Sequence, residues 1–115
     1  MEIKEPTQDE LKWFWKKCGL IEQPTGSWYT DTVPTKFVWQ GRIPLTTDNL
    51  DKYAVPRIEG EYQLTIKTIL RGYYVVSAEE CSEEIKRNMF YILDTNLTLA
   101  LFWVIYKVFK EKVDD

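Results

Sequence analysis

The segment NLTLALFWVIYKV, residues 96–108, decides the fold. Asn96 is a typical helix N-cap, and the apolar run after it predicts a helix that continues to about residue 112. Its apolar side chains fall on two sides, Leu97, Leu101, Val104 and Val108 on one and Leu99, Phe102, Tyr106 and Phe109 on the other. A helix that is apolar all round is buried all round. We therefore expect a sheet to cover one side and a second layer to cover the other.

The N-terminal segment predicts an amphipathic helix. Thr7-x-x-Glu10 is a capping box, which places the helix start at residue 8, and Gly19 supplies the residue that ends it. The face expected to enter the core consists of Leu11, Phe14, Trp15 and Cys18.

The middle of the chain predicts short strands and one short helix. Residues 28–32 and 36–40 are rich in aromatic, Thr and Val side chains, as strands are, and Pro34 between them indicates an edge or a loose hairpin. A short helix is predicted from the threonine pair at 46–47 to about residue 53. Pro56 is expected to mark its end, because the residue before a proline avoids the helical region.

The following segment predicts an antiparallel hairpin and then a third long helix. Tyr62, Leu64 and Ile66 alternate with polar residues, which is the period of a half-buried strand, and residues 73–76 form the next strand after a turn. Ser77-x-x-Glu80 is a second capping box, and it predicts a helix that continues to about residue 92. The apolar face of that helix would consist of Ala78, Cys81, Ile85, Met89 and Ile92.

Length and composition predict a single domain over residues 1–115. A chain of 115 residues has the length of one typical domain, and five Trp, seven Tyr and five Phe with a net charge of −3 exclude a disordered chain. The charged N-terminus and the lack of a long apolar run predict neither a secretory signal nor a membrane span, so we expect a protein of the cytoplasm. Cys18 and Cys81 are expected to be buried free thiols.

The absence of histidine excludes most familiar catalytic sites. No Ser-His-Asp triad, Cys-His dyad or imidazole metal site can be built, and no nucleotide-binding or zinc-protease motif occurs. The remaining candidate acids and bases are the loop carboxylates Asp31, Asp48, Asp51, Glu59 and Glu61. Asp48 and Asp51 suit the start of a helix, where the dipole favours negative charge. We therefore expect no catalytic residue, metal or cofactor, and a small enzyme that uses carboxylates or tyrosine is the alternative.

Six residues are candidates for an interaction surface: Trp13, Lys16, Lys17, Phe102, Tyr106 and Phe109. Trp13 falls opposite the apolar face of the first helix, beside Lys16 and Lys17, where an indole can stack on a partner. The other three belong to the second apolar side of the last helix, which either this chain or a neighbouring copy must cover. The net charge of −3 argues against nucleic acid as the partner. A protein partner or self-association is expected, and a small nucleotide ligand is an alternative.

Three segments resemble proteins of phages. LKWFWKKCG, residues 11–19, resembles the N-terminal helix of the phage ABA-sandwich domain family, and residues 96–108 resemble its final helix. IPLTTDNLDKYAVP, residues 43–56, is similar to a segment of small phage and prophage proteins. The resemblance implies a layered α-β-α sandwich encoded by a phage or prophage. It implies no catalytic residues and no particular biochemical role.

The residues and the resemblance together predict an α+β fold, a layered α-β-α sandwich with a small, mainly antiparallel sheet. The leading functional hypothesis is a non-enzymatic interaction module of a phage or prophage. One alternative is a counter-defence protein that inhibits a host nuclease or holds a signalling nucleotide between subunits. Another is a structural component that forms homo-oligomers.

Overall fold

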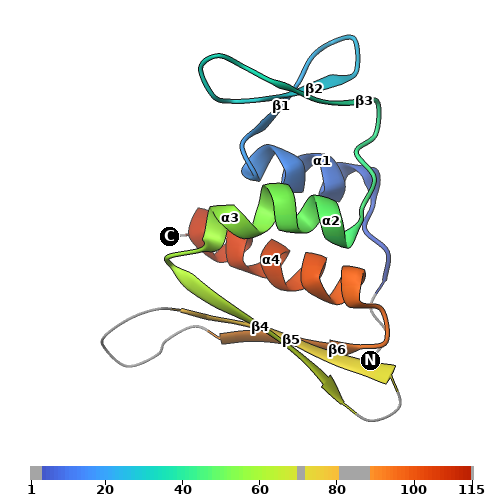
Figure 1. Ribbon diagram of the computed structural model, residues 1–115, viewed down its shortest axis with the longest axis vertical. Helices are drawn as coiled ribbons and strands as arrows, with labels where there is room; N and C mark the ends of the chain where they lie inside the picture. The colour runs from blue at the N-terminus through green and yellow to red at the C-terminus, as the bar shows by residue number, and fades with distance from the viewer. Residues whose placement is uncertain (1–3, 70–71, 81–88, 115) are drawn as a thin grey trace.

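The computed structural model describes residues 4–69, 72–80 and 89–114. Its elements are α1 (Gln8–Lys17), β1 (Leu20–Glu22), β2 (Ser27–Thr30), β3 (Phe37–Gln40), α2 (Thr47–Asn49), η1 (Leu50–Ala54), α3 (Val55–Ile58), β4 (Tyr62–Ile69), β5 (Tyr73–Glu80), β6 (Met89–Asp94) and α4 (Leu97–Asp114). Figure 1 shows the helices between two sheets, with β1–β3 at one end of the molecule and β4–β6 at the other.

Helix α4 forms the centre of the molecule. Asn96 caps it, since its side-chain oxygen accepts a hydrogen bond of 3.0 Å from the Leu99 N–H. Every residue from 100 to 105 is buried, as are Val108 and Phe109. Strands β5 and β6 contact α4 on one side, and α1 with the α2–α3 segment contacts it on the other. The two expected covering layers are therefore confirmed, and both belong to the same chain.

The sheet β4–β6 packs on α4 through one face. All its strands are antiparallel, in the order β4-β5-β6, and directly opposite residues share a face. On the face toward α4, Leu64 lies opposite Ala78, and Val76 lies opposite Ile92. Val76 and Ala78 are fully buried there. The hairpin predicted between residues 62 and 76 is confirmed, and its second strand continues to Glu80.

The helix expected after Ser77 is wrong over the residues that the structure describes. Residues 77–80 continue β5, and residues 89–94 form β6. Alternate residues 74, 76 and 78 fit a strand whose inner side chains pack on α4, and that packing outweighs the local capping-box pattern. Cys81, Ile85 and the other residues from 81 to 88 lie outside the described residues.

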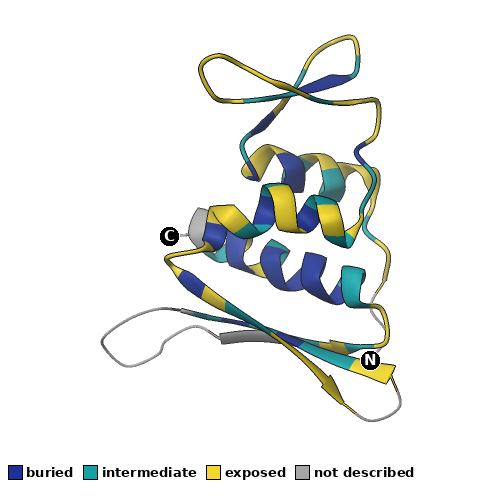
Figure 2. Cartoon of the chain, viewed as in Figure 1, coloured by how far each residue is buried: buried dark blue, intermediate teal, exposed yellow. Residues whose placement is uncertain are grey.

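The sheet β1–β3 is small and packs on α1. Its strands are antiparallel, with Leu20 opposite Thr30 and Trp28 opposite Trp39. The two expected runs become β2 and β3, and the irregular register between Trp28 and Tyr29 is a β-bulge, which suits the predicted loose hairpin. Leu20 and Trp28 are buried, whereas Ile21 and most of β3 are exposed (Figure 2).

The N-terminal helix follows the sequence prediction. The Thr7 side chain accepts from the Glu10 N–H at 3.2 Å, and Glu10 accepts from the Thr7 N–H at 2.9 Å, so the capping box forms. Gly19 follows the helix with a positive φ of 87°, a conformation that favours glycine. Phe14, Trp15 and Cys18 are buried as expected.

The expectation that Pro56 ends the second helical segment is wrong, because helix continues to Ile58. The turn before it is wide, and the Val55 N–H bonds the Leu50 carbonyl five residues back. Pro56 then lies in the first turn of α3, where its missing N–H has no intrahelical partner to lose.

The chain therefore has the expected α+β fold with antiparallel sheets. The order of its layers differs from α-β-α, because the strands form two sheets and the helices lie between them (Figure 1).

Candidate interaction surfaces

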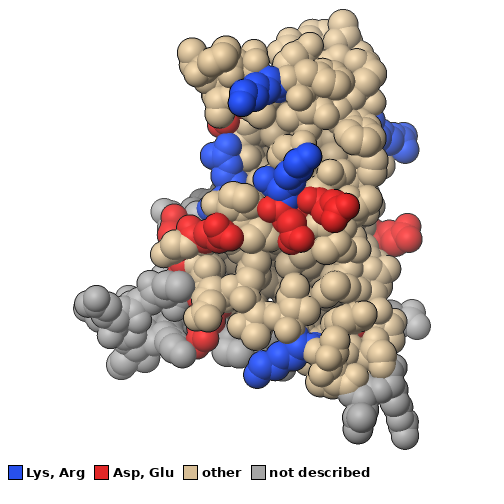
Figure 3. Space-filling model, viewed as in Figure 1, with Lys and Arg blue, Asp and Glu red and all other residues tan. Residues whose placement is uncertain are grey.

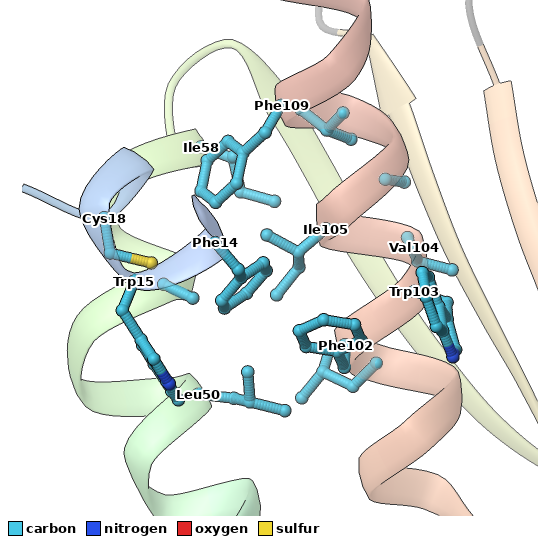
Figure 4. Close-up of a cluster of buried hydrophobic side chains, with 14 of the residues drawn as sticks. Phe14, Trp15, Cys18, Leu50, Ile58, Phe102, Trp103, Val104, Ile105 and Phe109 are labelled. Carbon is cyan, nitrogen blue, oxygen red and sulfur yellow. The ribbon is translucent and has the colours of Figure 1, made fainter. Parts of the chain in front are cut away.

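Two of the six predicted surface residues lie in the core. Phe102 is fully buried and Phe109 nearly so. Both pack on Phe14 of α1, with ring centroids 4.5 Å and 5.3 Å away (Figure 4). Their assignment to an interaction surface is therefore wrong. The side of α4 on which they lie is covered by α1 of the same chain, not by a neighbouring copy.

The other four predicted residues lie on or near the surface, where three of them form one cluster. The Trp13 ring packs on Tyr106, with centroids 5.0 Å apart. The Lys110 ammonium lies 4.5 Å from the Trp13 ring centroid, and that of Lys17 lies 5.6 Å away. Lys16 is exposed beside them. The sequence brought Trp13 and Lys17 together correctly, but Lys110 comes from the far end of the chain.

The aromatic rings of this cluster already have partners within the chain. Trp103 continues it, with its centroid 5.0 Å from Tyr106, and the Trp103 indole N–H donates to the Lys4 carbonyl at 2.9 Å. Lys4 also places its ammonium 5.7 Å from the Trp103 ring. Cation–π contacts of this kind stabilise exposed aromatic rings by about 0.5–1 kcal/mol each. These contacts join the N-terminal segment and α1 to α4.

A different surface carries apolar side chains without such cover. Ile21, Tyr29 and Phe37 lie opposite one another across β1, β2 and β3, on the face directed away from Trp28. Phe37 is 58% exposed and Ile21 is 43% exposed. The Tyr29 and Phe37 rings meet edge to face at 5.8 Å, so the outer face is an ordered aromatic surface. We call Ile21, Tyr29, Phe37 and the adjoining Val33 the hairpin face.

The turn between β2 and β3 holds Val33 at 99% exposure. The Thr30 and Thr32 hydroxyls lie 2.7 Å apart, and Thr32 donates to the Pro34 carbonyl at 3.0 Å. The Lys36 N–H donates to the Thr30 hydroxyl at 2.9 Å. A hydrogen-bonded turn thus presents an apolar side chain to solvent, and binding residues are often carried on loops that a scaffold positions.

Two ion pairs fix this sheet to the helices. Arg57 of α3 contacts the Asp31 carboxylate at 3.1 Å, directly over Gly19, and Lys12 of α1 approaches Glu22 to 3.8 Å. The Asp31 N–H also donates to the Gly19 carbonyl at 3.0 Å. These contacts join the small sheet to α1 and α3, and exposed ion pairs of this kind contribute about 0–1 kcal/mol each. Sequence reasoning marked the aromatic residues of the hairpin face as a surplus but could not tell which of them stay outside.

A groove of about 260 Å³ lies between α1 and the sheet β1–β3. Trp15 and Trp28 line it, with Lys12 and Arg42 among its polar residues. The Trp15 indole nitrogen is buried without a hydrogen-bond partner among the described residues. The groove is smaller than the usual range of about 300–1,000 Å³ for small-molecule sites. It therefore gives little support to the nucleotide-ligand alternative.

The described residues contain neither a metal-binding group nor a reactive thiol. Within them, no group of three His, Cys, Asp or Glu residues could bind a metal ion. Burial raises the pKa of the Cys18 thiol strongly, against a smaller opposing effect of Arg57. Since the thiolate is the reactive form, Cys18 is an inert core side chain.

Comparisons with family models, curated proteins and solved structures find no match to this chain. The resemblance to the phage ABA-sandwich family therefore stays a hypothesis. Among the described residues, none of the helices combines the length and the hydropathy that crossing a membrane requires.

Proposed function

We propose that this protein is a non-enzymatic interaction module that binds a protein partner through the hairpin face. The observation that carries the proposal is the exposure of Val33 and Phe37 on an ordered, hydrogen-bonded hairpin. Apolar side chains of this size are normally buried, and a contiguous exposed set marks a contact surface.

The composition of the hairpin supports a protein as the partner. Between Glu22 and Arg42, Asp31 and Lys36 are the only charged residues, although charged residues make up 29% of the chain. Asp31 is paired with Arg57. Figure 3 shows the corresponding end of the molecule as a largely uncharged surface. Protein interfaces are depleted in charge at their centre and enriched in aromatic residues, whereas a nucleic-acid surface needs many cations.

Val33→Asp combined with Phe37→Asp tests the proposal. Both side chains are exposed, so the double variant should fold with nearly the same melting temperature and should lose the partner. The wild-type protein is immobilised, and the proteins that bind to it are identified by mass spectrometry. One of these proteins is then purified and titrated into the wild-type protein and into the double variant, and calorimetry gives the affinity for each. Loss of a central aromatic anchor typically weakens binding by more than 2 kcal/mol, about 30-fold or more.

Ile69→Asp combined with Leu93→Asp is the matched control. Both are exposed apolar residues of the other sheet, on the face away from α4, so this double variant adds the same two negative charges elsewhere. It should leave the affinity unchanged. Equal binding of wild-type protein and of the Val33, Phe37 variant would refute the proposal.

The phage or prophage origin remains a hypothesis, and a counter-defence role would place the partner among host proteins. The homo-oligomer hypothesis has lost the observation that motivated it, because α4 is covered by its own chain.

A further inference from the structure

Strand β4 is a long, regular edge of the sheet β4–β6. It pairs with β5 over all eight of its residues without a register shift, and no other described strand pairs with it. It contains no proline, and Lys67 is its only charged residue. Proteins usually protect an edge with bulges, prolines or several charges, so an unprotected edge of this length is a site for strand addition.

The inner face beside this edge is only partly covered by α4. Ile66 lies opposite Val76, so both point to the same face, yet Val76 is fully buried and Ile66 is 46% exposed. A groove of about 480 Å³ runs here between β4 and α3, with an apolar lining of Val55, Tyr62, Leu64, Ile66 and Leu101. Gln63 also lines the groove, although alternation directs its side chain to the other face. The groove therefore includes the backbone of the edge strand.

Two carboxylates rim this groove. Asp51 of η1 and Glu59, which follows α3, both line it, and both are exposed. Neither carboxylate forms a hydrogen bond or ion pair with a described residue. Figure 3 shows acidic side chains gathered across the middle of this face, over the α2–α3 segment. An occupant with positive charge would match the rim, and apolar side chains would match the floor.

We propose that β4 accepts an added strand from a protein partner whose inward side chains are apolar in the middle and basic at the ends. Backbone hydrogen bonds to β4 would provide affinity. The added strand would lie about 4.8 Å from β4, so its apolar side chains would cover Leu64 and Ile66. Its Lys or Arg residues would reach Asp51 and Glu59.

A second copy of the chain fits this edge less well. Two copies paired through β4 would bring two sets of Asp51 and Glu59 to the same face, and like charges repel. A second copy offers Lys67 as the only cation on its β4, at an odd position that faces away from the groove. This site is independent of the hairpin face, which belongs to the other sheet.

The test uses the full chain and a fluorescein-labelled peptide, Lys-Thr-Val-Thr-Ile-Thr-Lys, followed by fluorescence anisotropy at low salt. We expect saturable binding with a Kd below about 1 mM, the range of weak transient contacts. Two N-methylated versions of the peptide are compared. Methylation of the threonine backbone nitrogens blocks the N–H groups along one edge of the peptide, and methylation at the valine and isoleucine blocks those along the other edge. One of the two versions should bind at least about tenfold more weakly, because it loses several strand hydrogen bonds.

Charge recognition is tested separately. Asp51→Asn combined with Glu59→Gln should weaken binding about five- to tenfold, and replacement of both peptide lysines by glutamate should do the same or more. Glu5→Gln combined with Asp9→Asn makes the same change in net charge away from the groove and should leave binding unaltered.

Three outcomes would overturn the proposal. The first is no change in peptide anisotropy up to about 1 mM protein. The second is binding that neither N-methylated version weakens. The third is a dimer in sedimentation that forms through β4 and excludes the peptide, which would make a second copy the occupant. Val33→Asp with Phe37→Asp should bind the peptide normally, so failure here and failure of the hairpin face are distinguishable.

Discussion

The two sheets have the same number of strands and the same order of strands, but they differ in strand length and in how many of their side chains enter the core. In β4–β6, strands of six and eight residues place Val76 and Ala78 against α4, and both are fully buried. In β1–β3, strands of three and four residues bury Trp28 but leave Phe37 and Trp39 exposed. The difference indicates that α4 anchors the stability of the fold, and that the small sheet is a surface carried by the helices.

Phe102→Ala should have the largest effect on stability. Phe102 is fully buried and contacts the ring of Phe14 at 4.5 Å, so truncation leaves a cavity at the centre of the core. We expect a loss of about 3–5 kcal/mol in the free energy of unfolding, measured by urea denaturation. Phe37→Ala removes the same side chain from the hairpin face and should cost less than about 1 kcal/mol. Similar losses for both variants would contradict the division of roles between the two sheets.

Gly19→Ala should have the next largest effect, because it strains the connection between α1 and the small sheet. Gly19 has a φ of 87°, and an added Cβ would meet the Arg57 guanidinium and the Asp31 carboxylate. The positive φ alone costs a residue with a Cβ about 1–2 kcal/mol, and displacement of the ion pair adds to it.

Gly41→Ala is the control for Gly19→Ala. Gly41 also has a positive φ, at 84°, but a Cβ there would meet open space. The difference in free energy of unfolding between the two variants reports the contact with Arg57 and Asp31. Equal losses would show that this contact does not hold the small sheet in place.

Trp13→Ala should cost about 1–2 kcal/mol, between the core and the surface values. The side chain is half-buried, and its loss removes the ring contact with Tyr106 and the cation–π contact with Lys110. Thermal unfolding of Trp13→Ala and Trp13→Phe measures it, and phenylalanine should recover part of the loss. If Trp13→Ala loses as much stability as Phe102→Ala, Trp13 belongs to the core. If it loses none, the intramolecular contacts of Trp13 do not stabilise the fold, and the side chain is available to a partner.

The elements with strong local signals were predictable from sequence. The capping box at Thr7 and Glu10, the Asn96 cap and the alternation after Tyr62 each specify structure within a few neighbouring residues. The segment after Ser77 was not predictable in this way, because its local pattern suits a helix and its pairing with β4 suits a strand. Long-range packing decided between the two.

The candidate surfaces show the same limit. Helical spacing placed Trp13 beside Lys17 correctly. The same spacing put Phe102 and Phe109 on one side of α4, but no local rule could identify the element that buries this side. The exposure of Phe37 depends on the outer face of β1–β3 having no covering element among the described residues, and the groove beside β4 depends on the helices leaving Ile66 partly uncovered. Both are properties of the assembled layers.

The smallest expected effect is the pH dependence of the stability that Glu10 contributes at the start of α1, the helix that joins the two regions. The backbone hydrogen bond from Thr7 lowers the pKa of Glu10, with Lys4 contributing. A carboxyl whose pKa is lower in the folded state stabilises the fold above its ordinary pKa of about 4.3, and this stabilisation is lost as the pH falls through the lowered value. Glu10→Gln keeps a capping box but cannot titrate. The difference in free energy of unfolding between wild type and Glu10→Gln should be about 0.3–1 kcal/mol at neutral pH and should shrink below about pH 4. A difference that stays constant with pH would mean that the Glu10 charge adds nothing to the cap.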